Sequence, residues 1–383
     1  MKLLHLSDLH LGKRVYEANF LEEQKYILEE IKQIIHEEAP NAVMIAGDIY
    51  DKAVPPIEAI QLFDDFVTFC AAGSLPLCII SGNHDSTERI SFASRLLDKQ
   101  GIYFSPGYDG NVRGVTLTDE YGKVNIHMLP FIKPAHVKRV YPEAEIENYE
   151  QAIQTVLSHM ELDASERNVL MLHQFVTGAS MCDSDYAAVG GLEQLPYTLF
   201  DSFDYVALGH IHGPQKIGRE TIRYCGTPLK YSFSEVSHKK SVTVLELKRK
   251  GETTVRTIPL KPLHDMRCIQ GSYMELTNRA NYIGTKTDDY LQITLTDEED
   301  IPDAIGRLRS IYPNLLKLSY DNTRTRKNAQ ALQASGVPAE ERTPLQFLEE
   351  LYQLQNQKEM NEEQKQYSMK IIEKVWEECD EAR

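Results

Sequence analysis

The sequence contains no hydrophobic run long enough to cross a membrane. Its apolar stretches, such as residues 41–49, fall far short of the roughly 18 residues that a transmembrane helix requires. The opening residues, MKLLHLSDLH, do not resemble a signal peptide either, because Asp8 and His10 interrupt the apolar stretch before a hydrophobic core forms. We therefore expect a cytoplasmic protein that makes no contact with membranes.

Cysteine is sparse and scattered. The six cysteines lie at positions 70, 78, 182, 225, 268 and 379, and no two of them form a CxxC pair. This pattern argues against a disulfide framework and against a thiolate zinc site. It is typical of a protein in a reducing compartment.

Basic residues are also fewer than acidic ones. The 57 acidic residues outnumber the 41 basic ones, and the formal net charge of −16 at first argues against a nucleic-acid ligand. Carboxylates that gather around metal ions would add to this negative count without repelling a phosphate group once the ions are bound. The charge therefore weakens a nucleic-acid function but does not exclude it.

Short apolar runs alternate with helical patterns through the first 260 residues or so. We expect strands at 2–6, 42–46, 77–80, 124–130, 169–173 and 204–208, a hairpin over 241–259, and helices at 21–38 and 57–71. Strands interleaved with helices indicate an α/β domain in which helices cover two sheets.

The rest of the chain divides into three shorter parts. A segment with two prolines, 259–265, marks the end of the first domain at about residue 262. Strand patterns at 291–295 and 315–320 flank a helical pattern at 302–311, so residues 266–325 are expected to form a small α+β domain. The polar stretch 326–342 is typical of a linker. In 343–383, Thr343 as N-cap and Pro344 as first helical residue open a predicted helical segment.

Five of the predicted strands end in the same way, with metal-binding side chains, most of them beside a glycine or serine. These ends are Ser7-Asp8-Leu9-His10, Gly47-Asp48, Ser81-Gly82-Asn83-His84-Asp85, His173 and Gly209-His210-Ile211-His212. Ligands of α/β sheets collect at the carboxyl ends of strands, so these ends can meet although they lie far apart in the sequence. Glycine permits the tight turns that such an arrangement needs.

Seven of these side chains form a donor set without a thiolate. The set comprises two carboxylates, one amide oxygen and four imidazoles, from Asp8, His10, Asp48, Asn83, His173, His210 and His212. It suits Mn²⁺, Fe²⁺ or Zn²⁺ in a two-metal centre better than a structural zinc. Asp48 is the natural bridge, since one carboxylate can give an oxygen to each of two ions about 3.5–4 Å apart. His210 and His212 can then reach different ions.

Taken singly, Asp8-x-His10 or Gly47-Asp48 could equally be turn or cap chemistry, but the ordered set is far more specific. Together these motifs resemble the calcineurin-like metallophosphoesterase superfamily. Longer stretches resemble its branch of bacterial nucleases that repair DNA double-strand breaks, over roughly residues 1–325. These stretches are MKLLHLSDLHLGK, GDIYDKAVPP, ISGNHDS, LGHIHGPQ and YCGTPLKYSFSE.

The resemblance implies a four-layer α/β/β/α sandwich with a small α+β capping domain and a C-terminal helical tail. It assigns one ion to Asp8, His10, Asp48 and His212, and the other to Asp48, Asn83, His173 and His210. His84 would face the scissile phosphate and act in catalysis with Asp48. The chain departs from archaeal and eukaryotic relatives at Asp51, where they usually carry a histidine, so the second phosphate-facing side chain is left open.

The resemblance also implies an activity and partners. It predicts a nuclease that uses two divalent ions, Mn²⁺ before Mg²⁺, as a 3′–5′ double-strand exonuclease and a single-strand and hairpin endonuclease. We expect it to act in DNA repair, recombination and replication near the nucleoid, as a homodimer bound to an SMC-like ATPase. The helix 57–71 could form the dimer interface, although burial in its own core is equally compatible with the sequence.

Residues for these partners can be named only as candidates. The expected phosphate contacts are Lys13, Arg14, Lys133, Lys230, Arg324 and Arg326, each of which could also be ordinary surface charge. The expected ATPase contacts are Leu345, Leu348, Leu351 and Tyr352, a stripe at helical spacing that could instead pack on the protein's own body.

Two other functions remain open. A phosphomonoesterase or cyclic-nucleotide phosphodiesterase would share every metal ligand, and only the small domain and the helical tail argue for a nuclease. A scaffold that has lost catalysis is the second alternative. It is disfavoured because all seven donors and His84 are present.

Overall fold

The computed structural model describes residues 1–16, 18–185 and 194–326, and in the C-terminal part residues 345, 348–349, 351–353, 358–369 and 371. The chain forms two compact units. One consists of Met1–Thr294 with Ile301–Ser319, and the other of Leu295–Asp300 with Tyr320–Arg383.

The first unit contains two six-stranded sheets. The first sheet has the order β14-β13-β1-β4-β5-β6. Its parallel strands are β1 (Lys2–Leu6), β4 (Ala42–Ala46), β5 (Leu77–Ile80) and β6 (Ile102–Ser105), and the hairpin β13 (Ser241–Leu247) and β14 (Thr253–Pro259) joins β1 in antiparallel fashion. The parallel strands are apolar along almost their whole length because both of their faces are covered.

The second sheet has the order β11-β12-β10-β9-β8-β7. Its parallel strands are β8 (Gly122–Leu129), β9 (Arg167–His173), β10 (Tyr205–Gly209) and β12 (Arg219–Tyr224), and its antiparallel edges are β7 (Arg113–Asp119) and β11 (Gln215–Ile217). Sequence patterns predicted β8, β9 and β10 but missed β12 and the edge strands β7 and β11. In the first sheet they missed β6.

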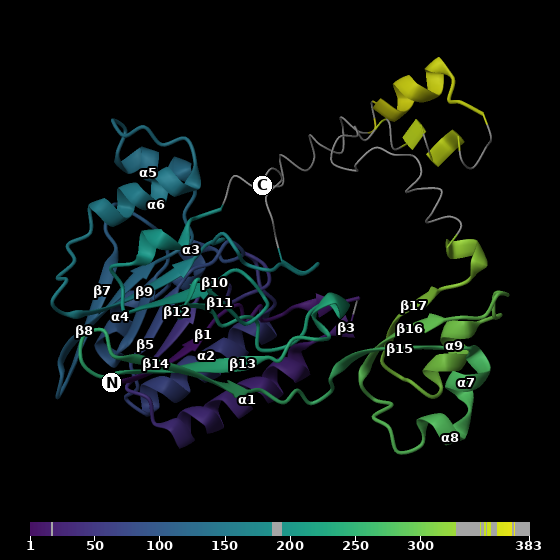
Figure 1. Ribbon diagram of the computed structural model, residues 1–383, viewed down its shortest axis with the longest axis horizontal. Coiled ribbons are helices and arrows are strands. Elements are labelled where there is room, and N and C mark those ends of the chain that lie inside the picture. The colour runs from purple at the N-terminus through teal and green to yellow at the C-terminus, as the bar shows by residue number, and fades with distance from the viewer. Residues whose placement is uncertain are drawn as a thin grey trace. The chain divides into compact units, whose positions relative to one another are not determined.

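Four layers result from these sheets and their helices (Figure 1). Helices α1 (Leu21–Glu38) and α2 (Ile57–Ala72) pack on the first sheet, and α5 (Pro134–Val140) and α6 (Tyr149–Ser158) pack on the second. A third core lies between the sheets, with side chains such as Met44 and Ile80 facing Val169 and Ala207. The predicted α/β/β/α sandwich is confirmed.

Smaller elements complete the first unit. They are the hairpin β2 (Arg14–Val15) and β3 (Ala18–Asn19), the short helices α3 (Thr87–Ile90) and α4 (Ser94–Leu97), and the 3-10 turns Asp98–Gln100, Tyr197–Phe200 and Phe233–Glu235. Among the residues that the structure describes, no helix is both long and apolar enough to span a membrane.

The segment after residue 262 forms a three-stranded sheet with short helices. Its strands are β15 (Met266–Gly271), β16 (Tyr290–Leu295) and β17 (Leu315–Tyr320), and its helices are α7 (Tyr273–Thr277), α8 (Arg279–Tyr282) and α9 (Ala304–Arg309). The division into compact units runs through this sheet rather than through 263–265. The domain boundaries expected from the sequence therefore stay predictions.

Much of the described C-terminal segment is helical. Residues 362–369 form a helix, and Leu345, Leu348 and Leu351 also lie in helical backbone. The Lys365 ammonium lies 2.8 Å from the Glu349 carboxylate, and the Gln364 amide donates to the Tyr352 hydroxyl at 3.0 Å. Thr343, Pro344 and the predicted linker after Arg326 lie outside the described residues.

Candidate metal centre

The five predicted strand ends meet at one place, and they come from both sheets. The ends of β1, β4 and β5 belong to the first sheet, and those of β9 and β10 belong to the second. Backbone hydrogen bonds join the first two ends, since the Asp8 N–H donates to the Gly47 carbonyl and the His10 N–H to the Asp48 carbonyl, both at 3.0 Å. The second sheet is joined by the His210 N–H, which donates to the Asp8 carboxylate at 2.9 Å.

Four donor residues occupy the left-handed region of backbone conformation. Their φ angles are 52° for Asp8, 45° for His10, 49° for Asp48 and 102° for His210. Residues other than glycine seldom adopt positive φ, although Asp, Asn and His do so more often than most. Such strain persists only where the surrounding structure imposes it, and it collects at functional sites.

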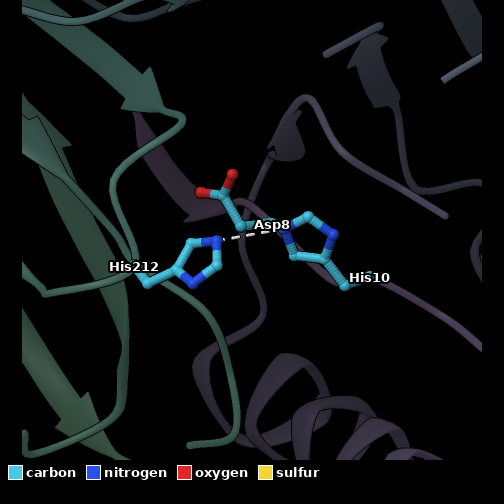
Figure 2. A group of neighbouring side chains, drawn as sticks. All are labelled: Asp8, His10 and His212. Atoms are coloured by element: carbon cyan, nitrogen blue, oxygen red, sulfur yellow. Dashed lines mark hydrogen bonds between the residues drawn. The ribbon is translucent and has the colours of Figure 1, made fainter. Parts of the chain in front are cut away.

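The first group of donors is Asp8, His10 and His212 (Figure 2). The Nε2 atoms of His10 and His212 face each other at 3.2 Å. Two nitrogens that bind one ion at about 2.1 Å, in right-angled to tetrahedral geometry, lie about 3.0–3.4 Å apart. The two imidazoles are therefore spaced as ligands of a common ion.

The second group of donors is Asn83, His173 and His210. The Asn83 Oδ1 lies 3.1 Å from the His173 Nε2 and 2.9 Å from the His210 Nδ1. Between the two groups lies the Asp48 carboxylate, whose Oδ2 is 3.4 Å from the His173 Nε2 and 3.6 Å from the His10 Nε2. All seven expected donors are thus brought together, and the division of the donors between two ions stays a prediction.

Burial and charge set the protonation of the donors. Burial raises the pKa of Asp8 to about 6, and it lowers the pKa of His210 to about 3. Burial alone would also disfavour the charged form of His173, but the Asp48 and Asp8 carboxylates raise the pKa of His173 to about 9. In return, His173 helps to hold the pKa of Asp48 well below its usual value despite burial. Without metal the site therefore keeps a proton on His173, and metal binding would release it because ligating imidazoles are neutral.

Hydrogen bonds fix the orientation of the imidazoles. The His173 Nδ1 lies 2.8 Å from the Ala46 carbonyl oxygen, which can only accept, so this nitrogen carries the proton when the ring is neutral and Nε2 faces Asn83 with its lone pair. The His212 Nδ1 lies 2.9 Å from the Ser184 hydroxyl. Partners of this kind hold the tautomer and direction of metal ligands.

A buried ion pair that was not predicted from the sequence contacts His212. Glu235 and Lys240 are ion-paired and buried, and the Lys240 ammonium also donates to the His212 carbonyl at 2.9 Å. The Asp185 carboxylate accepts from the His212 N–H at 2.7 Å. Glu235, Cys182 and His212 could hold an ion by distance alone, but Glu235 already balances Lys240, and we assign it to positioning His212.

Asp85 is a second residue whose role was missed. Its carboxylate accepts from the backbone N–H groups of Ile49, Tyr50 and Gly82 at 2.9–3.1 Å. It therefore ties the loop after β5 to the loop that carries Asp48. Its position at the end of the Gly-Asn-His-Asp motif was the only signal in the sequence, and the fold alone reveals which amides it meets.

His84 lies at the more accessible side of the donors. Its Nδ1 is 2.9 Å from the Asp51 carbonyl oxygen, which leaves Nε2 free, and its ring is half-buried whereas the four ligand imidazoles are buried. The Asp51 carboxylate binds the Lys13 ammonium at 2.6 Å. Asp51, where the resemblance implies a histidine in archaeal and eukaryotic relatives, therefore holds a lysine near His84.

The remaining basic candidates are dispersed. The Lys230 ammonium is paired with Asp265 at 2.8 Å, whereas Arg14 and Lys133 are exposed. In the second unit, Arg324 and Arg326 are paired with Asp300 and Asp321, both at 2.7 Å. Among the expected phosphate contacts, Lys13 pairs with Asp51, the residue whose carbonyl also holds His84.

Comparison with known proteins identifies the family. The model for calcineurin-like phosphoesterases matches residues 1–214, and the SbcD_C model, described as the type 5 capsule protein repressor C-terminal domain, matches residues 262–356. The chain is 34% identical over 323 residues to the D subunit of the nuclease SbcCD of Staphylococcus epidermidis, covering 83% of this chain and 85% of that protein. The chain belongs to the SbcD family of calcineurin-like phosphoesterases. It is thus a metal-dependent phosphodiesterase, a hydrolase.

Other proteins are similar to the chain at lower levels. The D subunit of the nuclease SbcCD of Staphylococcus saprophyticus is 33% identical over 323 residues, covering 83% of this chain and 84% of that protein. Among solved structures, a dimetal phosphatase from Danio rerio covers 69% of this chain and 98% of its own length at 12% identity, with a TM-score of 0.42. The protein TT1561 of Thermus thermophilus covers 67% and 98%, also at 12% identity, with a TM-score of 0.38.

The residues present fit the divalent metals that this family uses. Oxygen and imidazole donors without a thiolate match hard to borderline divalent ions. The separations of 2.9–3.6 Å between neighbouring donors leave room for ions rather than for further side chains.

Gly209→Ala is expected to abolish metal binding. A Cβ at Gly209 would lie 1.8 Å from the Ala46 carbonyl oxygen and 2.8 Å from the His173 Nδ1, so the end of β10 would have to move away from the end of β4 in the other sheet. Isothermal titration with Mn²⁺ measures the loss, which we expect to exceed 100-fold. Gly114→Ala is the matched control, since its Cβ would meet nothing within 4 Å. Wild-type Mn²⁺ affinity in Gly209→Ala would contradict the role given to this close approach.

Proposed function

We propose that the chain is the nuclease subunit of an SbcCD-type complex, which hydrolyses phosphodiesters in DNA. The proposed activities are 3′–5′ exonuclease action on double strands and endonuclease action on single strands and hairpins, with Mn²⁺ as the metal and Mg²⁺ as its substitute. The observation that carries the two-metal hydrolysis is the place of the Asp48 carboxylate, within 3.6 Å of an imidazole nitrogen from each donor group.

A phosphodiester resists hydrolysis because the nucleophile must approach an anion and the leaving group is poor. Divalent ions bound here would lower the pKa of an attacking water and neutralise charge on the phosphate oxygens. Asp8, His10, Asp48 and His212 would hold one ion, and Asp48, Asn83, His173 and His210 the other. The buried Glu235–Lys240 pair and Asp85 keep these ligands in place before the substrate arrives.

His84 is the proposed acid or phosphate-stabilising group. Its Nδ1 is held by the Asp51 carbonyl, so its Nε2 can face the phosphate and protonate the departing 3′ or 5′ oxygen. A positioned acid of this kind contributes about 10²–10⁴-fold to the rate. The Lys13 ammonium pairs at 2.6 Å with the carboxylate of Asp51, the residue whose carbonyl holds His84.

DNA contacts are proposed to be electrostatic and largely independent of sequence. Lys13 is the best-supported contact because of its place beside His84. Arg14, Lys133, Lys230, Arg324 and Arg326 remain proposals. Lys13, like Lys230, Arg324 and Arg326, would have to exchange a carboxylate partner for a phosphate. With DNA as the proposed substrate, the proposed setting is the cytoplasm, at the nucleoid, in DNA repair, recombination and replication.

The tail is the proposed contact with the SMC-like ATPase SbcC. Apolar side chains are exposed on its described residues, with exposed fractions of 52% for Leu351 and 68% for Tyr367. Leu348 adds to this surface, and Leu345 and Tyr352 are half-buried. An amphipathic helix with an uncovered apolar side is suited to docking in a groove of a partner.

Helix α2 and the segment after β5 are the proposed homodimer surface. Phe63 and Phe66 are buried within the chain, so these two phenylalanines belong to the chain's own core and not to a dimer interface. Exposed apolar side chains nevertheless remain nearby in the sequence, at Val54, Ile57, Ile60, Phe92 and Leu96. Exposed apolar side chains that form one continuous patch typically mark an interface, and we propose that these do.

A phosphomonoesterase or cyclic-nucleotide phosphodiesterase is the alternative. It would use the same donors, so the metal centre does not distinguish it from a nuclease. The nuclease is favoured because the chain continues beyond the sandwich into a segment that matches the SbcD_C model over residues 262–356.

Two substitutions separate metal binding from catalysis. Asp48→Ala is expected to lose both metal and activity, whereas His84→Ala should bind Mn²⁺ normally and lose about 10²–10⁴-fold in kcat. The assays use end-labelled duplex, hairpin DNA and bis(p-nitrophenyl) phosphate, each with Mn²⁺ or EDTA. The exposed residues His36 and Asp201 provide control alanine variants. Cleavage of the small diester without any action on DNA would reject the nuclease, and wild-type turnover by His84→Ala would reject the role of His84.

Deletion of residues 340–383 is expected to abolish association with SbcC and to spare Mn²⁺-dependent cleavage. A finer test is Leu351→Glu, which places a charge on the exposed apolar surface and should weaken the complex at least tenfold in a pull-down or calorimetric titration. Gln353→Glu adds the same charge at a neighbouring exposed polar residue and should not weaken the complex. Undiminished SbcC binding by the deletion variant would rule out this docking surface.

Ile57→Asp combined with Ile60→Asp is expected to convert a dimer into a monomer. Both side chains are exposed in the single chain, at 70% and 43%, so folding should be retained while an apolar interface is lost. Light scattering coupled to size exclusion measures the mass. Gln61→Asp, at an exposed position of the same helix, serves as the control. An unchanged mass for the double variant would place any dimer interface elsewhere.

A further inference from the structure

A pocket that adjoins the loop of metal donor His212 has a different chemistry from the metal centre. Its volume is about 430 Å³, and its lining includes Arg223, His238 and Lys239 together with the hydroxyls of Ser180 and Ser237. Among the described residues, no Asp or Glu lines this pocket, although the whole chain carries a net charge of −16. We call it the basic pocket.

The basic pocket adjoins the residue that follows metal donor His212. Gly213 belongs to its lining, and a Cβ on Gly213 would lie 3.1 Å from the His238 Cε1. Lys239 precedes Lys240, whose ammonium donates to the His212 carbonyl at 2.9 Å. Arg223 lies near the carboxyl end of β12, which runs parallel to β10. The basic pocket and the metal donors are therefore at the same edge of the second sheet.

Polar groups in this pocket lack partners. Within the described part of the chain, the buried Arg223 Nε and His238 Nδ1 have no hydrogen-bond partner. The His238 Nδ1 is 3.9 Å from the Glu235 carboxylate, which is too far for a hydrogen bond. The Arg223 guanidinium lies 3.6 Å from Glu220, whose side chain is 60% exposed, so solvent weakens that pair. Unpaired buried donors are costly, and a bound acceptor would satisfy them.

Phosphate is the ligand that fits these groups. Guanidinium and ammonium groups with nearby hydroxyls form charge-assisted hydrogen bonds to phosphate oxygens. On the proposed nuclease function, the metal centre takes the scissile phosphate, and the strand on either side carries further phosphates. A small diester has no such neighbour.

We propose that the basic pocket binds a non-scissile phosphate of the substrate strand, next to the phosphodiester that is cut. The inference rests on the proposed nuclease function and adds to it a residue set that selects a polymer over a small ester. Arg223 and Lys239 supply the charge, and His238 and the hydroxyls direct hydrogen bonds.

The test compares two substrates on the same enzyme. In Arg223→Gln and Lys239→Gln, KM for a labelled oligonucleotide duplex should rise about 5–20-fold with little change in kcat, and the slope of log K against log salt should fall by about one. Turnover of bis(p-nitrophenyl) phosphate should stay within twofold of wild type. Lys239 is exposed, so its variant keeps the test valid if Arg223→Gln folds poorly.

Lys123→Gln controls for loss of a positive charge. Lys123 is the second residue of β8 and so lies at the amino end of the parallel strands, opposite to the metal donors, and its side chain is 56% exposed. Its KM for DNA should match that of wild type. An equal rise in KM for Lys123→Gln would mean a general charge effect and would overturn the proposal.

Chemically altered DNA identifies the contacted group. Neutral methylphosphonate is placed at one backbone position at a time on either side of the cut. Wild type should lose affinity at one such position, and Arg223→Gln should be insensitive to that same change. Equal sensitivity of both proteins at every position, or parallel losses on bis(p-nitrophenyl) phosphate, would refute a phosphate subsite. Failure of wild type to cleave any DNA while it cleaves the small diester would instead reject the nuclease function itself.

Discussion

The Asp48 carboxylate is the point at which the two sheets depend on each other. It lies between imidazoles that come from β9 on one sheet and from the loop after β1 on the other, and it accepts the His84 N–H at 2.9 Å. Two glycines make this approach possible, since a side chain at Gly82 would overlap Asp48 and one at Gly209 would overlap the β4 backbone. The site therefore requires the full sandwich, and no single strand–loop unit could form it.

The strands and their metal-binding ends were predictable because both are local signals. An apolar run followed by Asp, His or Asn, in most cases beside glycine or serine, marks β1, β4, β5, β9 and β10 in the sequence, with errors of only one or two residues at most boundaries. Short or partly exposed strands such as β7 and β12 escaped because their burial alternates and their runs are interrupted by polar residues.

The supporting groups were not predictable in the same way. Glu235 and Lys240 look like ordinary surface charges in the sequence, and only the fold shows them buried against each other behind His212. In the sequence, Arg324 and Arg326 were candidate phosphate contacts, and only the fold shows that both are paired with neighbouring carboxylates. Pairing of charges depends on tertiary distance, whereas apolar periodicity does not.

The left-handed backbone at Asp8, Asp48 and His210 restricts how the site can change over evolution. At each position a replacement must suit both the ion and a conformation that few residues tolerate. Asparagine meets the second demand at the two aspartates, whereas a longer or branched side chain does not. If the metal preference changes during evolution, we therefore expect an amide to replace a carboxylate, because this removes charge without reshaping the loops. Replacement by a longer ligand side chain is disfavoured.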